Sequence, residues 1–202
     1  MTANLWFLRA VVAAFSGVAG IVVLRRVGVT SRRRELALIG AVPAIAGCSP
    51  PLLLPTAVPL VLFGVSAAIV DFAEYRVPNR LSATFFVSLM ALIACTAMFS
   101  GTPEMLLRGV VGGVAWAVLL LASFVLSRHP GPGDVKLAPS LGLLAGAAGW
   151  PAIGAAIVFS YLIAGIQALA IVVLRPEQRR IPLAPAMVGG TVLAIALTPL
   201  AD

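Results

Sequence analysis

Hydrophobic residues run almost without interruption along this chain, and short polar segments divide them into stretches of helix length. At about 1.5 Å per residue, roughly 20 apolar residues form a helix that crosses the hydrocarbon core of a bilayer. Three prolines between positions 50 and 55 interrupt the longest stretch, which predicts two short spans around a tight turn. The pattern therefore predicts about eight membrane-spanning helices, at 5–24, 36–70 (two spans), 81–99, 105–126, 135–149, 152–174 and 183–200.

Composition supports the same fold class. Of the 202 residues, 61% are hydrophobic and only 10% are charged, whereas a soluble domain keeps about a quarter of its residues charged. These values exclude a soluble globule, and they equally exclude a disordered chain or a disulfide scaffold. The sequence predicts one all-α, polytopic transmembrane bundle over residues 1–202, with no separate soluble domain.

Basic residues outnumber acidic ones, fourteen to seven, for a formal net charge of +7. In a soluble protein this excess would suggest a nucleic-acid partner, but in a membrane protein Lys and Arg collect in the cytoplasmic loops. The predicted spans place twelve of the fourteen in alternate loops on one side, with Arg9 and Arg108 toward the other. We therefore expect both termini outside the cytoplasm and no nucleic-acid partner.

Two of the three aspartates occupy matching positions. Asp71 ends the third predicted span and Asp134 directly precedes the sixth, with two spans between them. An even number of crossings returns the chain to the same face, so both carboxylates should lie at the cytoplasmic ends of their helices. An ionisable group at the bilayer centre costs about 2.5–3.5 kcal/mol, so intramembrane carboxylates usually have a function.

The chemistry of such a pair follows from its surroundings. Two carboxylates brought together beside a low-dielectric region cannot both ionise cheaply, so one proton is shared between them. The ionised member then takes a proton from water while the neutral member donates to a carbonyl oxygen, as in aspartic proteases. This chemistry predicts no metal and no cofactor. In the alternative interpretation, each aspartate caps a helix or pairs with Arg76, Arg80 or Lys136.

The residues before Asp134 are Gly131-Pro132-Gly133. Glycine permits unusual backbone dihedral angles and close approach of another chain, and proline prevents the loop from continuing the preceding helix. A protease binds its substrate in an extended form, so an open backbone beside a catalytic acid would be useful. A plain turn between helices is the alternative.

Three sequence segments match one family pattern in order. They are Asp71 followed by Val77-Pro78-Asn79, the run from Gly131 to Leu137 (Gly-Pro-Gly-Asp-Val-Lys-Leu), and Ile181-Pro182-Leu183-Ala184-Pro185. On these segments the chain resembles the type IV prepilin peptidases, integral membrane proteases of the GxGD aspartic class. The resemblance is strongest over residues 60–200, and Ala184 stands where the family commonly has Gly.

The resemblance implies an activity and its residues. Asp71 and Asp134 would be the catalytic pair, and Gly131 and Gly133 would shape the loop around them. The substrates would be prepilins or pseudopilins, including the Flp type, whose short basic leader is removed at the cytoplasmic face of the bacterial membrane. Larger members carry a cysteine-rich insert and also N-methylate the new terminus. This chain has no such insert, so the resemblance implies cleavage without methylation.

Four charged residues near the two aspartates are weaker candidates. Lys136 would either tune Asp134 or hold the helix end at the headgroups. Glu74 would either contact the cationic leader or lie in solvent. We expect Arg76 and Arg80 to contact lipid phosphates and to face away from a basic leader, which they would repel.

Glycines recur at close spacing in two of the predicted spans, namely Gly109, Gly112 and Gly113 in one and Gly142 and Gly146 in another. Helices in membranes pack closely where small residues meet. We expect these glycines to serve helix packing.

Other functions for the aspartate pair remain open at the level of sequence. A small transporter or proton-coupled carrier would use the pair as a relay and would require polar groups across the membrane. A presenilin-like protease would place its first aspartate deep inside a helix. A non-catalytic assembly factor would not bring the two together.

Overall fold

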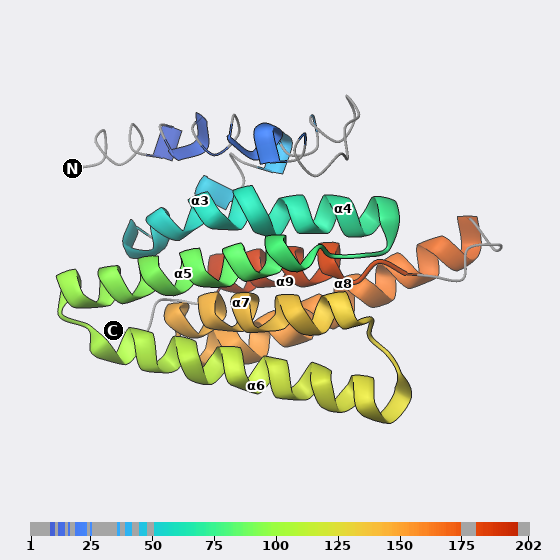
Figure 1. Ribbon diagram of the computed structural model, residues 1–202. Helices are drawn as coiled ribbons and strands as arrows, with labels where there is room; N and C mark the ends of the chain where they lie inside the picture. The colour runs from blue at the N-terminus through green and yellow to red at the C-terminus, as the bar shows by residue number, and fades with distance from the viewer. Residues whose placement is uncertain are drawn as a thin grey trace.

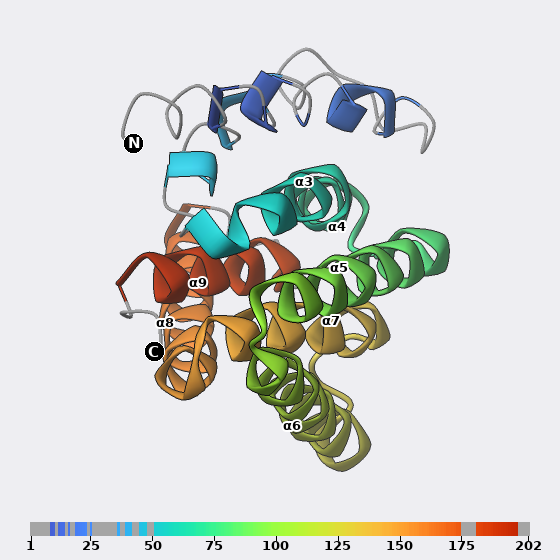
Figure 2. The same cartoon turned by 90° about the vertical axis from the view of Figure 1, so that its left-hand side faces the viewer.

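The computed structural model describes residues 51–174 and 181–197 without a break, together with isolated positions between 9 and 47. The regular elements in this part of the chain are all helical, and it includes no strand. The predicted all-α class is therefore confirmed. Figures 1 and 2 show the arrangement of the helices in two views.

The first helical element that the structure describes without a break is Pro51–Glu74. It combines η1 (Pro51–Thr56), α3 (Ala57–Pro59), η2 (Leu60–Val65) and α4 (Ser66–Glu74). The helices that follow are α5 (Asn79–Ser100), α6 (Pro103–Ser127), α7 (Pro132–Ala148), α8 (Trp150–Leu174) and α9 (Ala184–Leu197). Pro51–Glu74 and these five helices correspond to the last six predicted spans. The first predicted span and the first half of the stretch 36–70 lie largely outside the described residues.

One detail of the prediction was wrong, because Pro55 lies inside a helix rather than in a tight turn. Pro55 is the fifth residue of the described helix, which starts at Pro51. A 3₁₀ turn accommodates it. Pro59 is followed at once by the wider π-type turns of η2.

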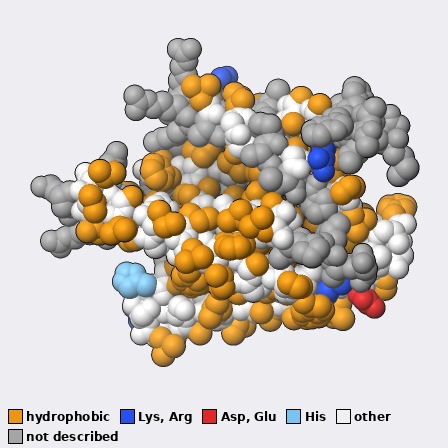
Figure 3. All heavy atoms as spheres, turned by 180° about the vertical axis from the view of Figure 1, so that it is seen from behind, with side chains coloured by type: hydrophobic (Ala, Val, Ile, Leu, Met, Phe, Trp, Pro, Cys, Tyr) orange, Lys and Arg blue, Asp and Glu red, His pale blue; other side chains and the backbone are white. Residues whose placement is uncertain are grey.

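Among the residues that the structure describes, four helices are long and apolar enough to cross a membrane, by length and composition: Pro51–Glu74, α5, α6 and α8. Helix α8 has an almost wholly apolar and mostly exposed surface; Ile166, for example, is 70% exposed. Hydrophobic side chains also cover most of the described surface in Figure 3. A surface of this kind suits lipid rather than water.

Helix α7 is the centre of the bundle. It lies between α5, α6, α8 and α9 (Figure 2), and nearly every residue from Leu137 to Ala148 is buried. The predicted glycine packing is confirmed at its contact with α6. A Cβ atom on Gly112 would lie 2.5 Å from the carbonyl oxygen of Gly142, and one on Gly142 would overlap the carbonyl group of Gly112. The two backbones are therefore in direct contact.

Loops with basic residues gather at one end of the bundle. The connections α4–α5 and α6–α7 lie there, together with the end of α8 and the start of α9 (Figure 1). The short connections at Gly101 and Gly149 lie at the opposite end. Asp71 and Asp134 are therefore at the same end, as the even number of crossings predicted.

Candidate active site

Asp71 lies in the last turns of α4 and is only 6% exposed. The helix ends at Tyr75, which adopts a left-handed conformation (φ 54°) and donates its backbone N–H to the Asp71 carbonyl oxygen at 2.8 Å. An extended segment then returns along α4, and α5 begins after Pro78. The end of α4 therefore holds Asp71 in a fixed, buried position at the basic end of the bundle.

The Asp71 side chain has a partner from a distant part of the chain. Its Oδ2 atom accepts a hydrogen bond from the backbone N–H of Ala184, at 3.1 Å. Ala184 is the first residue of α9, where backbone N–H groups lack partners within the helix and favour a negative charge. The Ile181–Pro185 segment, singled out in the sequence only by resemblance, thus supplies a donor to the first aspartate.

Asp134 lies in the first turn of α7 and is 7% exposed. Gly131 precedes the helix and Pro132 begins it, so the fixed φ of proline starts the turn that carries the carboxylate. The backbone N–H of Asp134 donates to the carbonyl oxygen of Gly131 at 3.1 Å, which closes the first turn. Oδ1 of Asp134 is buried and has no hydrogen-bond partner among the residues that the structure describes.

Neither glycine of this loop has an unusual dihedral angle, but Gly133 leaves room for a close contact. Gly131 has an ordinary extended conformation (φ −63°), and Gly133 does not have a positive φ. A Cβ atom on Gly133 would lie 3.2 Å from both the backbone nitrogen and the Cγ2 atom of Val77. Gly133 thus allows the start of α7 to lie against the segment that follows Asp71.

A polar contact joins the same two segments. The Nζ atom of Lys136 donates to Oδ1 of Asn79 at 2.7 Å, across 57 residues of sequence. Together with the contact between Gly133 and Val77, it fixes the segment after Asp71 against the start of α7. All three segments of the sequence pattern therefore meet at one end of the bundle.

The two carboxylates are close enough to influence each other. Burial raises the pKa of Asp134 to about 7, with a further contribution from the negative charge of Asp71 and an opposing one from the Gly131 backbone. Asp134 lies in the first turn of α7, which is not one of the four long apolar helices. At neutral pH it thus retains its proton in a large fraction of molecules. The N–H of Ala184, in contrast, suits an ionised Asp71.

The other predicted residues occupy different surroundings. Glu74 pairs with Arg76, whose Nε lies 2.6 Å from a Glu74 carboxylate oxygen. Lys136 is directed at Asn79. Tyr161 of α8, which the sequence analysis did not single out, lies within electrostatic reach of Asp134. Nothing in its sequence neighbourhood marks it as part of a site.

Comparison with known protein families gives one match. The family described as the type IV leader peptidase family matches residues 58–173, from α3 to α8. This region contains both aspartates and the glycine loop, and it ends before the Ile181–Pro185 segment. No curated protein and no solved structure matches the chain.

Proposed function

The chain belongs to the type IV leader peptidase family, and from this premise we propose that it is an aspartic endopeptidase with Asp71 and Asp134 as its catalytic pair. Its substrates are type IV prepilins, pseudopilins or Flp-type precursors. It removes their short basic leader at the cytoplasmic face of the bacterial membrane. Gly131 and Gly133 form the loop beside which the substrate lies.

One observation carries this proposal: two buried carboxylates from separate helices lie at the basic end of the bundle, within electrostatic reach of each other, and have different partners. Asp71 accepts the Ala184 N–H, which favours its ionised form, whereas Asp134, with a pKa of about 7, keeps its proton in a large fraction of molecules near neutral pH. A pair of carboxyl groups with different surroundings divides the roles of base and acid between them.

The division of roles gives a complete reaction. Asp71 takes a proton from a water molecule, whose oxygen attacks the carbonyl carbon of the scissile peptide bond. Asp134 donates its proton to the carbonyl oxygen, which forms a tetrahedral intermediate with two hydroxyl groups. When the C–N bond breaks, the proton held by Asp71 passes to the leaving nitrogen, and Asp134 regains a proton from one hydroxyl.

Topology supports the proposed face of the membrane. The described basic residues Arg76, Arg80, Arg128 and Lys136 lie at the end of the bundle that holds both aspartates. Lys and Arg favour the cytoplasmic side. The position of both aspartates at one end also disfavours a transporter, since a relay needs ionisable groups distributed across the membrane. The absence of a cysteine-rich insert from the sequence supports cleavage without N-methylation.

The test uses the full chain, purified in detergent, and a synthetic peptide with a basic leader and an apolar stem. We expect Asp71→Asn and Asp134→Asn each to lower the cleavage rate by about 10²–10⁴-fold, because each removes one member of an acid–base pair. Mass spectrometry of the products gives the position of the cut. Circular dichroism verifies that each variant keeps its helices.

Glu104→Gln is the matched control, because Glu104 is an exposed acid in the first turn of α6, at the opposite end of the bundle. It should cleave at the rate of the unmodified protein. Full activity in either aspartate variant would overturn the assignment of the pair.

A further inference from the structure

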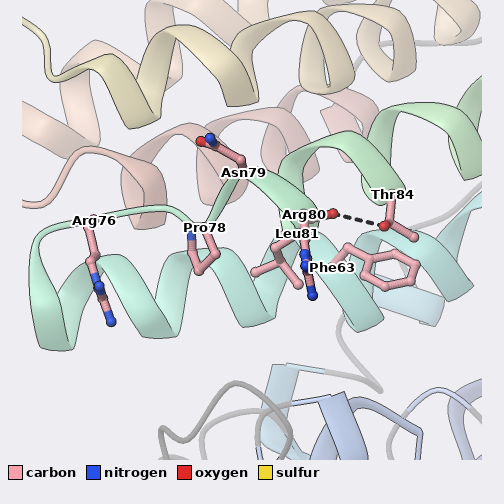
Figure 4. Close-up of a pocket in the computed structure, with 7 residues that line it drawn as sticks. All are labelled: Phe63, Arg76, Pro78, Asn79, Arg80, Leu81 and Thr84. Carbon is pink, nitrogen blue, oxygen red and sulfur yellow. Dashed lines mark hydrogen bonds between the residues drawn. The ribbon is translucent and has the colours of Figure 1, made fainter.

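The hydrogen bond to Asp71 depends on where α9 lies. Within the described part of the chain, the backbone N–H of Ala184 is the sole donor to the Asp71 side chain. The described polar side chains around the groove between the Pro51–Glu74 helix and α5 form no hydrogen bond with Asp71. In Figure 4, for example, the Thr84 hydroxyl donates to the Arg80 carbonyl oxygen instead. Since α9 itself contains no ionisable residue, it acts on Asp71 through its first N–H group.

Helix α9 is held chiefly by α8. The two helices lie side by side (Figure 2), and α9 touches α7 and α4 less extensively. Their backbones meet at Gly190 and Ser160, because a Cβ atom on Gly190 would overlap the backbone nitrogen and the Oγ atom of Ser160. Ser160 is only 2% exposed and lies in the middle of α8. Glycine at position 190 therefore allows α9 to approach α8 more closely than any side chain would permit.

Ser160 also contacts α9 one turn closer to the start of that helix. Its Oγ atom donates to the carbonyl oxygen of Met187 at 3.4 Å. Met187 in turn donates its N–H to the Leu183 carbonyl oxygen at 3.0 Å, so it belongs to the first turn of α9, with Ala184. Gly190 lies six residues after Ala184, about 9 Å along the helix at 1.5 Å per residue. A displacement of α9 from Ser160 is therefore transmitted to the first N–H group of the helix.

We propose that Gly190 is a positioning residue for the peptidase reaction, because its contact with Ser160 holds the Ala184 N–H against Asp71. This role rests on the proposed function, in which Asp71 is the base. A hydrogen bond weakens steeply when its angle departs from alignment, so a small displacement of α9 removes support from the ionised carboxylate. Neither aspartate lies on α9, so both keep their places on α4 and α7. A change at Gly190 should therefore slow the reaction without disturbing the binding of the substrate.

The test compares two neighbouring glycines in the full chain, purified in detergent. A Cβ atom on Gly189 would meet the Cδ1 atom of Ile163 at the ordinary contact distance of 3.6 Å, so Gly189→Ala is the matched control. NMR measures hydrogen exchange at the Ala184 amide, and steady-state kinetics measures peptide cleavage. We expect Gly190→Ala to exchange about tenfold faster at Ala184 and to lower kcat about tenfold with KM unchanged, as for the loss of a hydrogen bond to a charged group. Gly189→Ala should change each value by less than about twofold.

A second variant, Ala184→Pro, removes the N–H itself, and proline is well tolerated at the first position of a helix. It should lower kcat about as much as Gly190→Ala, and in its background Gly190→Ala should lower kcat no further. Effects that multiply, an unchanged Ala184 exchange rate in Gly190→Ala, or equally faster exchange throughout α7 would each overturn the role of Gly190. Cleavage at the full rate by Asp71→Asn would instead refute the proposed function, whereas the exchange measurement does not depend on it.

Discussion

Helix α7 is held in two different ways along its length. Against α6 its backbone is in direct contact with a second backbone, through Gly112 and Gly142, and no side chain lies between them. At its other end, around Asp134, it meets the segment after α4 through a glycine contact and one hydrogen bond, from Lys136 to Asn79. The contact with α6 leaves no room for a side chain at either glycine. The contact around Asp134 depends on one glycine and one hydrogen bond.

This difference separates stability from activity. Backbone packing in a membrane bundle supplies much of the association between helices, because lipid and apolar side chains are equally hydrophobic. Polar contacts at the end of the bundle add little to the packing, but they decide where two carboxylates lie. Changes at the α6–α7 contact should therefore unfold the protein, whereas changes around Asp134 should alter the reaction and leave the fold intact.

The largest effect is expected from Gly142→Ala. Its new Cβ atom would overlap the Gly112 carbonyl group, so α6 and α7 would have to separate. Overpacking of a core costs about 1–3 kcal/mol when side chains can adjust, and here the obstacle is backbone. We expect a loss of at least about 3 kcal/mol in the free energy of unfolding, measured by thermal unfolding in detergent, with activity lost in proportion to folded protein.

Gly154→Ala is the control for this prediction. Nothing lies within 4 Å of a Cβ atom at Gly154 in α8, so the substitution should stabilise the helix by up to about 1 kcal/mol. Equal stability of the two variants would mean that the α6–α7 backbone contact is not what limits substitution.

The second prediction concerns pH. Asp134 must hold a proton to act as the acid, and its pKa is raised to about 7 by burial and by the charge of Asp71. The protonated form therefore predominates below about pH 7 and is lost as the pH rises. We expect the cleavage rate to fall about tenfold per pH unit well above pH 7, while the circular dichroism spectrum stays constant.

A pH profile of the same reaction in D₂O gives a second test, because the midpoint of an acid-dependent step shifts upward with the pKa of the acid. A rate that is constant from pH 6 to pH 9 would contradict the assignment of Asp134 as the proton donor. A fall in rate accompanied by loss of helix would instead indicate that the charge on Asp134 disrupts the fold.

Much of the fold followed from the hydrophobic pattern. The predicted spans match the described helices to within a few residues at most ends, and the glycine face of α6 and α7 was identified from spacing alone. Pro55 was misplaced because the prolines from 50 to 55 indicated a turn, whereas the structure accommodates Pro55 inside a 3₁₀ helix.

The partners of the two aspartates were harder to predict. The donor to Asp71 is the backbone N–H of Ala184, and an alanine side chain gives no sign of a polar role. The bond between Lys136 and Asn79 joins loops 57 residues apart, and its existence depends on how two helix ends meet. The side chains that perform chemistry were visible in the sequence, but the backbone groups that support them were not.

The smallest effect is expected at this bond between Lys136 and Asn79. Both residues are exposed, so its loss should cost about 1 kcal/mol, less than the roughly 1.5–3 kcal/mol typical of a hydrogen bond to a charged group. We expect Lys136→Met and Asn79→Ala each to lower kcat about fivefold with KM unchanged, because the bond positions one aspartate against the other without contacting the substrate. Steady-state kinetics of peptide cleavage gives both parameters.

The double variant distinguishes this role from the alternatives. If the two side chains act through one bond, Lys136→Met/Asn79→Ala should be no slower than either single variant, and Lys136→Arg should recover part of the rate. A lysine that contacted the substrate would raise KM instead, and the effects of the two substitutions would multiply. That result would move Lys136 from a positioning role to substrate binding, and it would show that the end of α7 around Asp134 is held by the Gly133–Val77 contact alone.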